Sequence, residues 1–230
     1  MQAIILATRK ATRLLPLTKE KAQCLLKIKD KTILELQVEN LKKAGIDDIS
    51  VITGYLSNEV ETFCKELGIK TIFNPFYEVS GMALSLWVTK EKFKGGFIFL
   101  YSDILFDSEI IRDSIKNKAD ICLCIKKDGL RWEAEKVIEK EGIIKKLSKT
   151  RTGKENGEFI GIAKFSGAGT EKLIKELDNI AKVNLNASFI EAIDNIIDTG
   201  GIVEAHNIEN AKFIDIDFPE DLERAKKLFI

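Results

Sequence analysis

The chain begins with QAIILA (residues 2–7) followed by TRKATRLLPLT (residues 8–18). Gln2–Ala7 is an almost continuous apolar run, as expected of a strand that helices cover on both faces of a parallel sheet. Arg9 and Lys10 interrupt this run too early for a signal peptide. We therefore predict the first strand at Gln2–Ala7, with a polar loop after it.

Strands and helices alternate through the first half of the chain. A helix is predicted from Thr32, because Thr32 and Glu35 form a capping-box pattern and Leu34, Val38 and Leu41 continue an apolar stripe. Further strands are predicted at 49–53, 70–73, 97–101 and 120–125, and further helices at 58–67, 83–93 and 108–116. This alternation predicts an α/β fold, a Rossmann-like, doubly wound, mixed and mostly parallel sheet flanked by helices.

The pattern is looser after Lys126. A hairpin is predicted over 134–148, with its turn near Glu141-Gly142, and a last helix from Pro219, since proline favours the first helical position. Between them we predict a polar loop at 149–157, strands at 158–165, 202–208 and 213–216, and helices near 170–181 and 188–199. We expect one domain over residues 1–230, made of two halves at 1–126 and 127–230.

Composition excludes several classes of partner. Thirty-six basic side chains balance 36 acidic ones without a long basic block, so no nucleic-acid partner is expected. No apolar run reaches the roughly 18–20 residues of a membrane span, so no membrane partner is expected. Cys24, Cys64, Cys122 and Cys124 lack zinc spacing and are predicted to be buried, reduced thiols of a cytoplasmic protein. The sequence leaves open whether the chain forms a homo-oligomer.

Candidate site residues follow the predicted strands, because ligands of open α/β sheets bind beyond the carboxyl ends of the strands. Asp103 and Asp217 are each either a metal ligand or a helix cap, and Asp215 is an alternative ligand in place of Asp217. Arg13 is either a phosphate contact or a solvated surface charge. His206, inside a predicted strand, is expected to be structural.

A set of short motifs runs in order along nearly the whole chain. They are Arg13-Leu14, Pro16-Leu17-Thr18, Leu25-Leu26, residues 32–39, Ala44-Gly45-Ile46, Gly54-Tyr55, Asn74-Pro75, Ser85-Leu86, Ser102-Asp103 and residues 215–221. This set resembles the signature of nucleotidylyltransferases that join an NTP to a sugar or alcohol phosphate. It is most similar to the small cytidylyltransferases acting on phosphocholine, inositol 1-phosphate or phosphonates.

The resemblance implies a fold of the nucleotide-diphospho-sugar transferase type. It also implies nucleotidyl transfer from an NTP, with CTP favoured, to a phosphorylated small molecule (an alcohol phosphate, a phosphonate or a sugar 1-phosphate), with release of pyrophosphate. Residues 1–126 would be the nucleotide-binding half and residues 127–230 the acceptor-binding half.

By the same resemblance, Asp103 and Asp217 are ligands of a Mg²⁺ cofactor, and Arg13 holds the β- and γ-phosphates. Gln23 stands where the family has a lysine on the α-phosphate, and it completes the expected catalytic set. The expected nucleotide-binding residues are Leu6, Ala7, Thr8, Arg9, Lys10, Ala11, Thr12, Arg13, Gln23, Ser80, Gly81 and Ser85. The expected acceptor-binding residues are Lys136, Lys149, Glu158 and Glu191.

The phosphate loop departs from the family pattern. Thr8, Arg9 and Ala11 replace a small residue and two glycines, and Gln23 replaces the lysine. Arg9 therefore either contacts a phosphate itself or fills the pocket. Two functions stay open: an active nucleotidylyltransferase, which Asp103 and Asp217 favour, and a catalytically impaired homologue that binds nucleotide as a regulatory or binding module.

Overall fold

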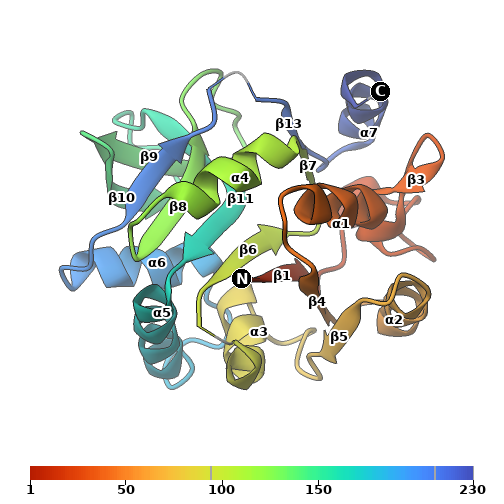
Figure 1. Cartoon of the computed structure of the whole chain (residues 1–230), viewed down its shortest axis with the longest axis horizontal. Helices are drawn as coiled ribbons and strands as arrows, with labels where there is room; N and C mark the ends of the chain where they lie inside the picture. Colours follow the sequence, from red (N-terminus) through yellow and green to blue (C-terminus); the bar gives the residue numbers. More distant parts are fainter. Residues whose placement is uncertain (94, 210, 230) are drawn as a thin grey trace.

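The computed structural model describes residues 1–93, 95–209 and 211–229. Its main sheet consists of β1 (Gln2–Ala7), β4 (Asp48–Thr53), β5 (Lys70–Phe73), β6 (Phe97–Tyr101), β8 (Ile121–Lys126), β9 (Glu135–Lys140), β10 (Ile143–Ser148), β11 (Gly157–Phe165) and β12 (Glu204–Asn207). The strand order is β5-β4-β1-β6-β11-β8-β12-β10-β9 (Figure 1). Two small antiparallel ribbons pair β2 (Lys27–Ile28) with β3 (Lys31–Thr32), and β7 (Ile104–Phe106) with β13 (Phe213–Asp215).

Helices cover both faces of the sheet (Figure 1). They are α1 (Ile33–Lys43), α2 (Ser57–Glu66), α3 (Met82–Thr89), α4 (Ser108–Lys116), α5 (Gly167–Ile180), α6 (Phe189–Asp198) and α7 (Pro219–Leu228), with short 3₁₀ turns η1 (Thr12–Leu14), η2 (Gln23–Leu25) and η3 (Lys90–Lys92). Alternate residues of β1 explain the two layers: Ile4 and Leu6 pack with α3, α5 and α6, whereas Ala3 and Ile5 pack with α1, α2 and α4. The first strand is therefore buried on both faces, as its apolar run predicts.

The strand directions confirm the mixed sheet. β1 is parallel to β4 and β6, β4 to β5, and β8 to β12. β11 and β10 run opposite to the other strands of this sheet.

β11 joins the two halves of the chain. Its second half pairs with β6, its first half pairs with β9, and both parts pair with β8. The register shifts between Phe159 and Ala163, around Gly161, which has a φ of 79°. A Cβ at position 161 would lie 2.7 Å from Cδ2 of Tyr101, so glycine is required both for the backbone conformation and for space.

Most predicted elements are present with ends shifted by a few residues. The capping box of Thr32 and Glu35 is confirmed, and the hairpin turns at Glu141-Gly142. The predicted helix near 170–181 begins earlier, at Gly167, because the Ser166 side chain caps it by accepting from the Gly169 N–H. The sequence analysis did not find β2, β3 or β7.

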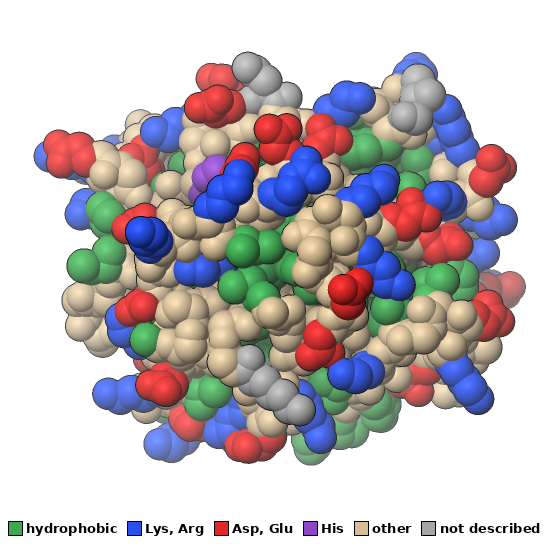
Figure 2. All heavy atoms as spheres, viewed as in Figure 1, with side chains coloured by type: hydrophobic (Ala, Val, Ile, Leu, Met, Phe, Trp, Pro, Cys, Tyr) green, Lys and Arg blue, Asp and Glu red, His purple; other side chains and the backbone are tan. Residues whose placement is uncertain are grey.

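The four cysteines are buried and free, as predicted. Within the described residues, no helix combines the length and the apolar character needed to cross a membrane. Figure 2 shows basic and acidic side chains interspersed over one face of the molecule, in keeping with the formal net charge of zero.

Candidate active site

A cavity of about 570 Å³ opens beyond the carboxyl ends of β1 and β6. It lies within the usual size of small-molecule sites. Predicted site residues that line it are Leu6, Arg9, Lys10, Ala11, Thr12, Arg13, Gln23, Asp103, Lys149 and Asp217. The structure thus brings together residues from both halves of the chain.

The loop after β1 lacks the glycines that the family pattern expects, and hydrogen bonds fix its backbone. Thr18 Oγ1 donates to the Ala11 carbonyl at 2.7 Å, and the Tyr55 N–H donates to the Thr8 carbonyl at 3.1 Å. None of residues 8–13 has a positive φ, so this loop forms without glycine. Arg9 lines the cavity.

Three aspartates converge where β6 and β13 end. The Ile216 N–H donates to the Asp103 carbonyl at 2.9 Å, which fixes the two segments side by side. Burial and the nearby charge of Asp217 raise the pKa of Asp103 to about 6. Burial also raises the pKa of Asp217, and burial together with the charge of Asp103 raises that of Asp215. The negative charge of each of the three carboxylates is therefore unfavourable at this buried position.

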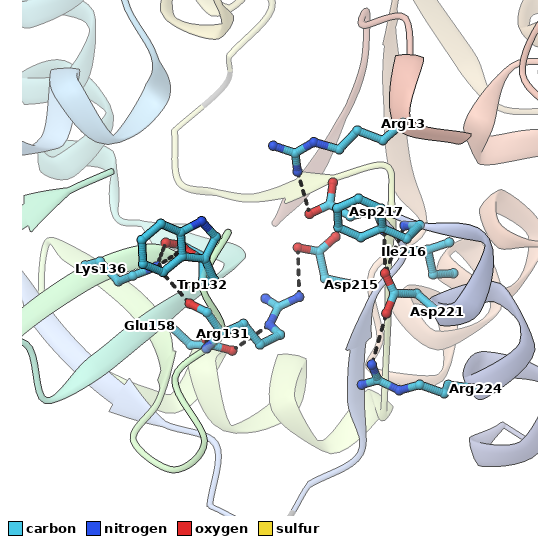
Figure 3. A network of polar contacts seen from close by, with 12 residues as sticks. Arg13, Arg131, Trp132, Lys136, Glu158, Asp215, Ile216, Asp217, Asp221 and Arg224 are labelled. Carbon is cyan, nitrogen blue, oxygen red and sulfur yellow. Dashed lines mark hydrogen bonds and ion pairs between the residues drawn. The ribbon is translucent and has the colours of Figure 1, made fainter. Parts of the chain in front are cut away.

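Each aspartate at the end of β13 has an arginine partner (Figure 3). Arg13 Nη1 lies 3.4 Å from Asp217 Oδ2, and Arg131 Nη1 lies 3.2 Å from Asp215 Oδ2. The start of α7 is capped by Asp221, whose Oδ2 accepts from the N–H groups of Phe218 at 2.9 Å and Asp217 at 3.2 Å. The Asp217 side chain does not cap this helix and is directed to the cavity instead.

Asp103 and Asp217 fit a magnesium ion. Asp103 Oδ1 is buried and has no hydrogen-bond partner in the part of the chain that the structure describes. Such an orphaned oxygen is costly unless a ligand satisfies it. No cluster of three or more acidic, histidine or cysteine side chains among the described residues is arranged for a metal. Two carboxylates suit Mg²⁺, which retains water and phosphate ligands.

Gln23 lines the cavity but its amide is engaged elsewhere. Gln23 Nε2 donates to the Ile216 carbonyl at 2.6 Å, between the two aspartates of the β13 end. Gln23 thus ties η2 to the segment that carries Asp217.

Five predicted nucleotide-binding residues do not line this cavity. Ala7 and Thr8 are buried at the end of β1. Asn74 Nδ2 donates to Ser80 Oγ at 3.2 Å and to Ser85 Oγ at 3.0 Å, so both hydroxyls are engaged with Asn74. Gly81 packs against the chain at Asn186 and Ala187, where a Cβ would come within 2.2 Å of a carbonyl oxygen.

Three of the four predicted acceptor-binding residues also lie outside the cavity. Lys136 is 1% exposed, and its ammonium donates to backbone carbonyls. Glu158 is 1% exposed and pairs with Arg131. Glu191 is exposed and accepts from the Ser188 N–H at the start of α6. Only Lys149 of this predicted set lines the cavity.

The structure adds cavity residues that the sequence analysis missed. Tyr101 donates its hydroxyl hydrogen to Glu135 Oε2 at 2.9 Å, and burial raises the pKa of Glu135 to about 7. Trp132 is 75% exposed at the cavity, with the guanidinium carbon of Arg151 5.6 Å from its ring centroid. Arg131 also lines the cavity. Arg131, Trp132 and Glu135 lie at or beside the start of the predicted hairpin, whereas Tyr101 ends the strand predicted at 97–101. The position of the hairpin residues becomes informative only once the register of β9 with β11 is known.

Comparison with known proteins supports the assignment that this geometry indicates. The chain is 28% identical to the CTP:phosphoglutamine cytidylyltransferase of Campylobacter jejuni, over 97% of this chain and 98% of that protein. It is 33% identical to the choline-phosphate cytidylyltransferase of Streptococcus pneumoniae, over 49% of each chain.

A solved structure of the inositol-1-phosphate CTP transferase from T. maritima superimposes with a TM-score of 0.85. It covers 99% of this chain and 94% of that one at 24% identity, a likeness that establishes the fold. Residues 2–131 match the sequence profile of the nucleotidyl transferase family. The chain therefore belongs to the nucleotidyl transferase family and is a nucleotidyltransferase.

Proposed function

We propose that the protein transfers a cytidylyl group from CTP to a phosphorylated small molecule and releases pyrophosphate. The acceptor is an alcohol phosphate, a phosphonate or a sugar 1-phosphate, and the cofactor is Mg²⁺. The observation that carries this proposal is the orphaned Asp103 oxygen beside Asp217, in a cavity whose other wall is the cationic loop Arg9–Arg13. The full-length similarity to a cytidylyltransferase supports the choice of CTP.

The reaction joins two anions. A phosphate oxygen of the acceptor forms a bond to the α-phosphorus of CTP, and the bond from that phosphorus to the oxygen bridging to the β-phosphorus breaks. Pyrophosphate leaves with the electron pair of that bond. Mg²⁺ held by Asp103 and Asp217 would supply positive charge that offsets the repulsion between the phosphates.

The side chains of the cavity supply binding and orientation. Arg9, Lys10 and Arg13 line one wall and are suited to the triphosphate, for which forked guanidinium donors match phosphate geometry. Lys149 comes from the acceptor half and suits the acceptor phosphate as a point charge. An acceptor phosphate is already anionic, so no general base is needed.

The proposal is tested by measuring pyrophosphate release with CTP, UTP, GTP and ATP against a panel of phosphate and phosphonate acceptors in Mg²⁺. Asp103→Asn should lower kcat by about 10²–10³-fold, because a ligand of the cation that offsets the phosphate charge is lost. Asp198→Asn is the matched control, since Asp198 lies on the surface and pairs with Lys146.

The alternative is a module that binds nucleotide without turnover. It is favoured if CTP with Mg²⁺ raises the melting temperature while no acceptor yields pyrophosphate. In that case the combined change of Arg9→Gly, Ala11→Gly and Gln23→Lys should create activity. If no nucleotide shifts the melting temperature and no pyrophosphate appears, the proposal is wrong.

A further inference from the structure

Two aspartates compete for the same role at the end of β13. Asp215 ends β13 and Asp217 follows two residues later, and both line the same cavity as Asp103. Spacing alone therefore leaves open which of the two joins Asp103 in holding a metal. The contacts of the two carboxylates differ.

Arg131 is fixed to the protein before it reaches Asp215. Its backbone N–H donates to Glu158 Oε2 at 2.8 Å, and its Nε donates to Glu158 Oε1 at 3.0 Å. Because Glu158 is 1% exposed, this pair is held in the interior rather than at the surface. Both oxygens of the carboxylate are used, so the arginine is anchored by its main chain and its side chain together.

A buried ammonium fixes the loop that carries Arg131. Lys136 Nζ donates to the carbonyls of Arg131 and Trp132, each at 2.8 Å, and to that of Ala134. The loop therefore wraps its carbonyls around a single cation (Figure 3). This leaves the free end of the Arg131 guanidinium directed at Asp215.

The two arginine–aspartate pairs are unequal. The Arg131 side chain is 27% exposed, so solvent competes weakly with its contact to Asp215. The Arg13 side chain is 53% exposed and meets Asp217 through one contact of 3.4 Å. An exposed arginine can leave its carboxylate for a phosphate. An arginine that is anchored at two points would first have to break a buried ion pair, which costs more free energy.

We propose that Arg131 is a positioning residue that permanently occupies Asp215 and so leaves Asp103 and Asp217 as the metal-binding pair. Arg131 acts through Asp215 rather than on the substrate. This inference rests on the proposed function, because it presupposes a divalent cation at Asp103. This role also explains the buried ion pair between Glu158 and Arg131, which holds the arginine in position.

The test is a titration of the full chain with Mn²⁺ in the absence of nucleotide. The signal of free Mn²⁺ in electron paramagnetic resonance gives the dissociation constant. Mn²⁺ shares the oxygen-ligand preference of Mg²⁺. Asp103→Asn and Asp217→Asn should each weaken binding by about 10–100-fold, whereas Asp215→Asn should change it less than about 3-fold. Asp198→Asn is the control for the loss of one surface charge.

Substitution of Arg131 provides a second test in the same Mn²⁺ titration. Arg131→Met should tighten Mn²⁺ binding about 3–10-fold, because the Asp215 carboxylate becomes free to join the ion. The double variant Arg131→Met with Asp215→Asn should return to within about 3-fold of the natural protein, a reversal that general loosening of the fold would not produce. Circular dichroism identifies a variant that fails to fold, and the contrast between Asp215→Asn and Asp217→Asn then decides the question.

The outcomes separate the two proposals. If Asp103→Asn does not weaken Mn²⁺ binding, the metal site and with it the proposed function are wrong. If Asp103→Asn weakens binding but Asp215→Asn weakens it as much as Asp217→Asn does, the metal site stands and the role of Arg131 is wrong. Unchanged binding in a folded Arg131→Met protein also overturns that role.

Discussion

Tyr101 occupies the space that any side chain at position 161 would need. Its ring packs over Gly161, and its hydroxyl reaches Glu135 across the cavity wall. The ring also contacts Phe99, Phe159 and Phe189 in edge-to-face geometry. A single aromatic residue at the end of β6 therefore couples the bulge of β11 to the shape of the cavity.

Gly161→Ala should lower the free energy of unfolding by about 3 kcal/mol. Roughly 1–2 kcal/mol comes from the positive φ and the remainder from the contact with Tyr101. Urea unfolding followed by circular dichroism measures the change. Gly153→Ala is the matched control, because Gly153 has a φ of 82° but no neighbour within 4 Å of a Cβ. Equal losses in both variants would show that the Tyr101 contact carries no cost.

Glu135 should make the protein less stable as the pH rises. Its folded-state pKa is raised from 4.5 to about 7, so the folded state holds this proton more tightly than the unfolded chain does. The associated stability is fully present below pH 4.5 and is lost as the pH rises through about 7. Glu135→Gln, which stays neutral, should therefore be more stable than the natural protein at pH 8, by at most about 3 kcal/mol, and not at pH 4.5. Urea unfolding at the two pH values tests this, and an equal difference at both would contradict it.

Residues that directly follow a strand were predictable, and residues placed by strand register were not. Asp103 lies in the cavity because parallel strands end at one edge of the sheet, and Asp217 lies there because it follows β13, which pairs with β7 just after β6. Glu135 reaches the same cavity only because β9 pairs with the first half of β11, where Phe159 lies opposite it. Sequence spacing does not encode that pairing. The ammonium of the neighbouring Lys136, which the family resemblance places near the acceptor, donates to carbonyls of the loop before β9.

The loop 131–134 behaves as an element of its own, although it has no regular secondary structure. Its carbonyls converge on Lys136, and its side chains Arg131, Trp132 and Glu133 line the cavity. Buried carbonyl groups need donors, and here one ammonium supplies three. The position of this loop therefore depends on a residue that does not itself touch the cavity.

Lys136→Met should destabilise the protein by about 3 kcal/mol or more, because buried carbonyls lose their donor. It should also make the loop sensitive to trypsin at Arg131. Lys149→Met is the matched control: Lys149 is exposed at the cavity, so its loss should leave the free energy of unfolding within about 0.5 kcal/mol of the natural value. If urea unfolding gives the same small change for both variants, Lys136 does not organise the loop.

Long elements were predicted and short ones were not. β1, β6 and β8 are apolar over five or more residues, which is enough for the pattern to be distinct. β7 spans three residues and β2 and β3 two each, shorter than the roughly four to eight residues over which a strand pattern can be recognised. β7 exists because β13, more than 100 residues later, pairs with it at Asp215 and Ile104.

The two halves of the chain share one core around β11. Phe97 and Phe99 of β6 are fully buried, and their rings stack on Phe165 at 4.9 Å and Phe189 at 4.3 Å. Both partners belong to the second half of the chain. The burial of Phe97 and Phe99 therefore depends in part on the second half of the chain.

Residues 1–126 should therefore fail to fold as an isolated fragment. Without β11 the edge of β6 is unpaired and its phenylalanines are exposed, which is unfavourable for a sheet. A two-dimensional amide NMR spectrum should show poor dispersion, and heating should give no cooperative transition, whereas the whole chain should melt in one transition. A fragment with a sharp melting curve of its own would instead show that the halves are independent domains.

The exposed indole at the rim of the cavity provides the protein with its own optical probe. Trp132 is open to solvent beside the Arg151 guanidinium, so a ligand that enters the cavity changes the polarity around the ring. The other tryptophan, Trp87, lies on α3 with its Nε1 donating to Asp178, away from the cavity lining. Emission from Trp132 in a Trp87→Phe protein thus reports occupancy in solution without any attached dye, while a Trp132→Phe protein supplies the silent reference.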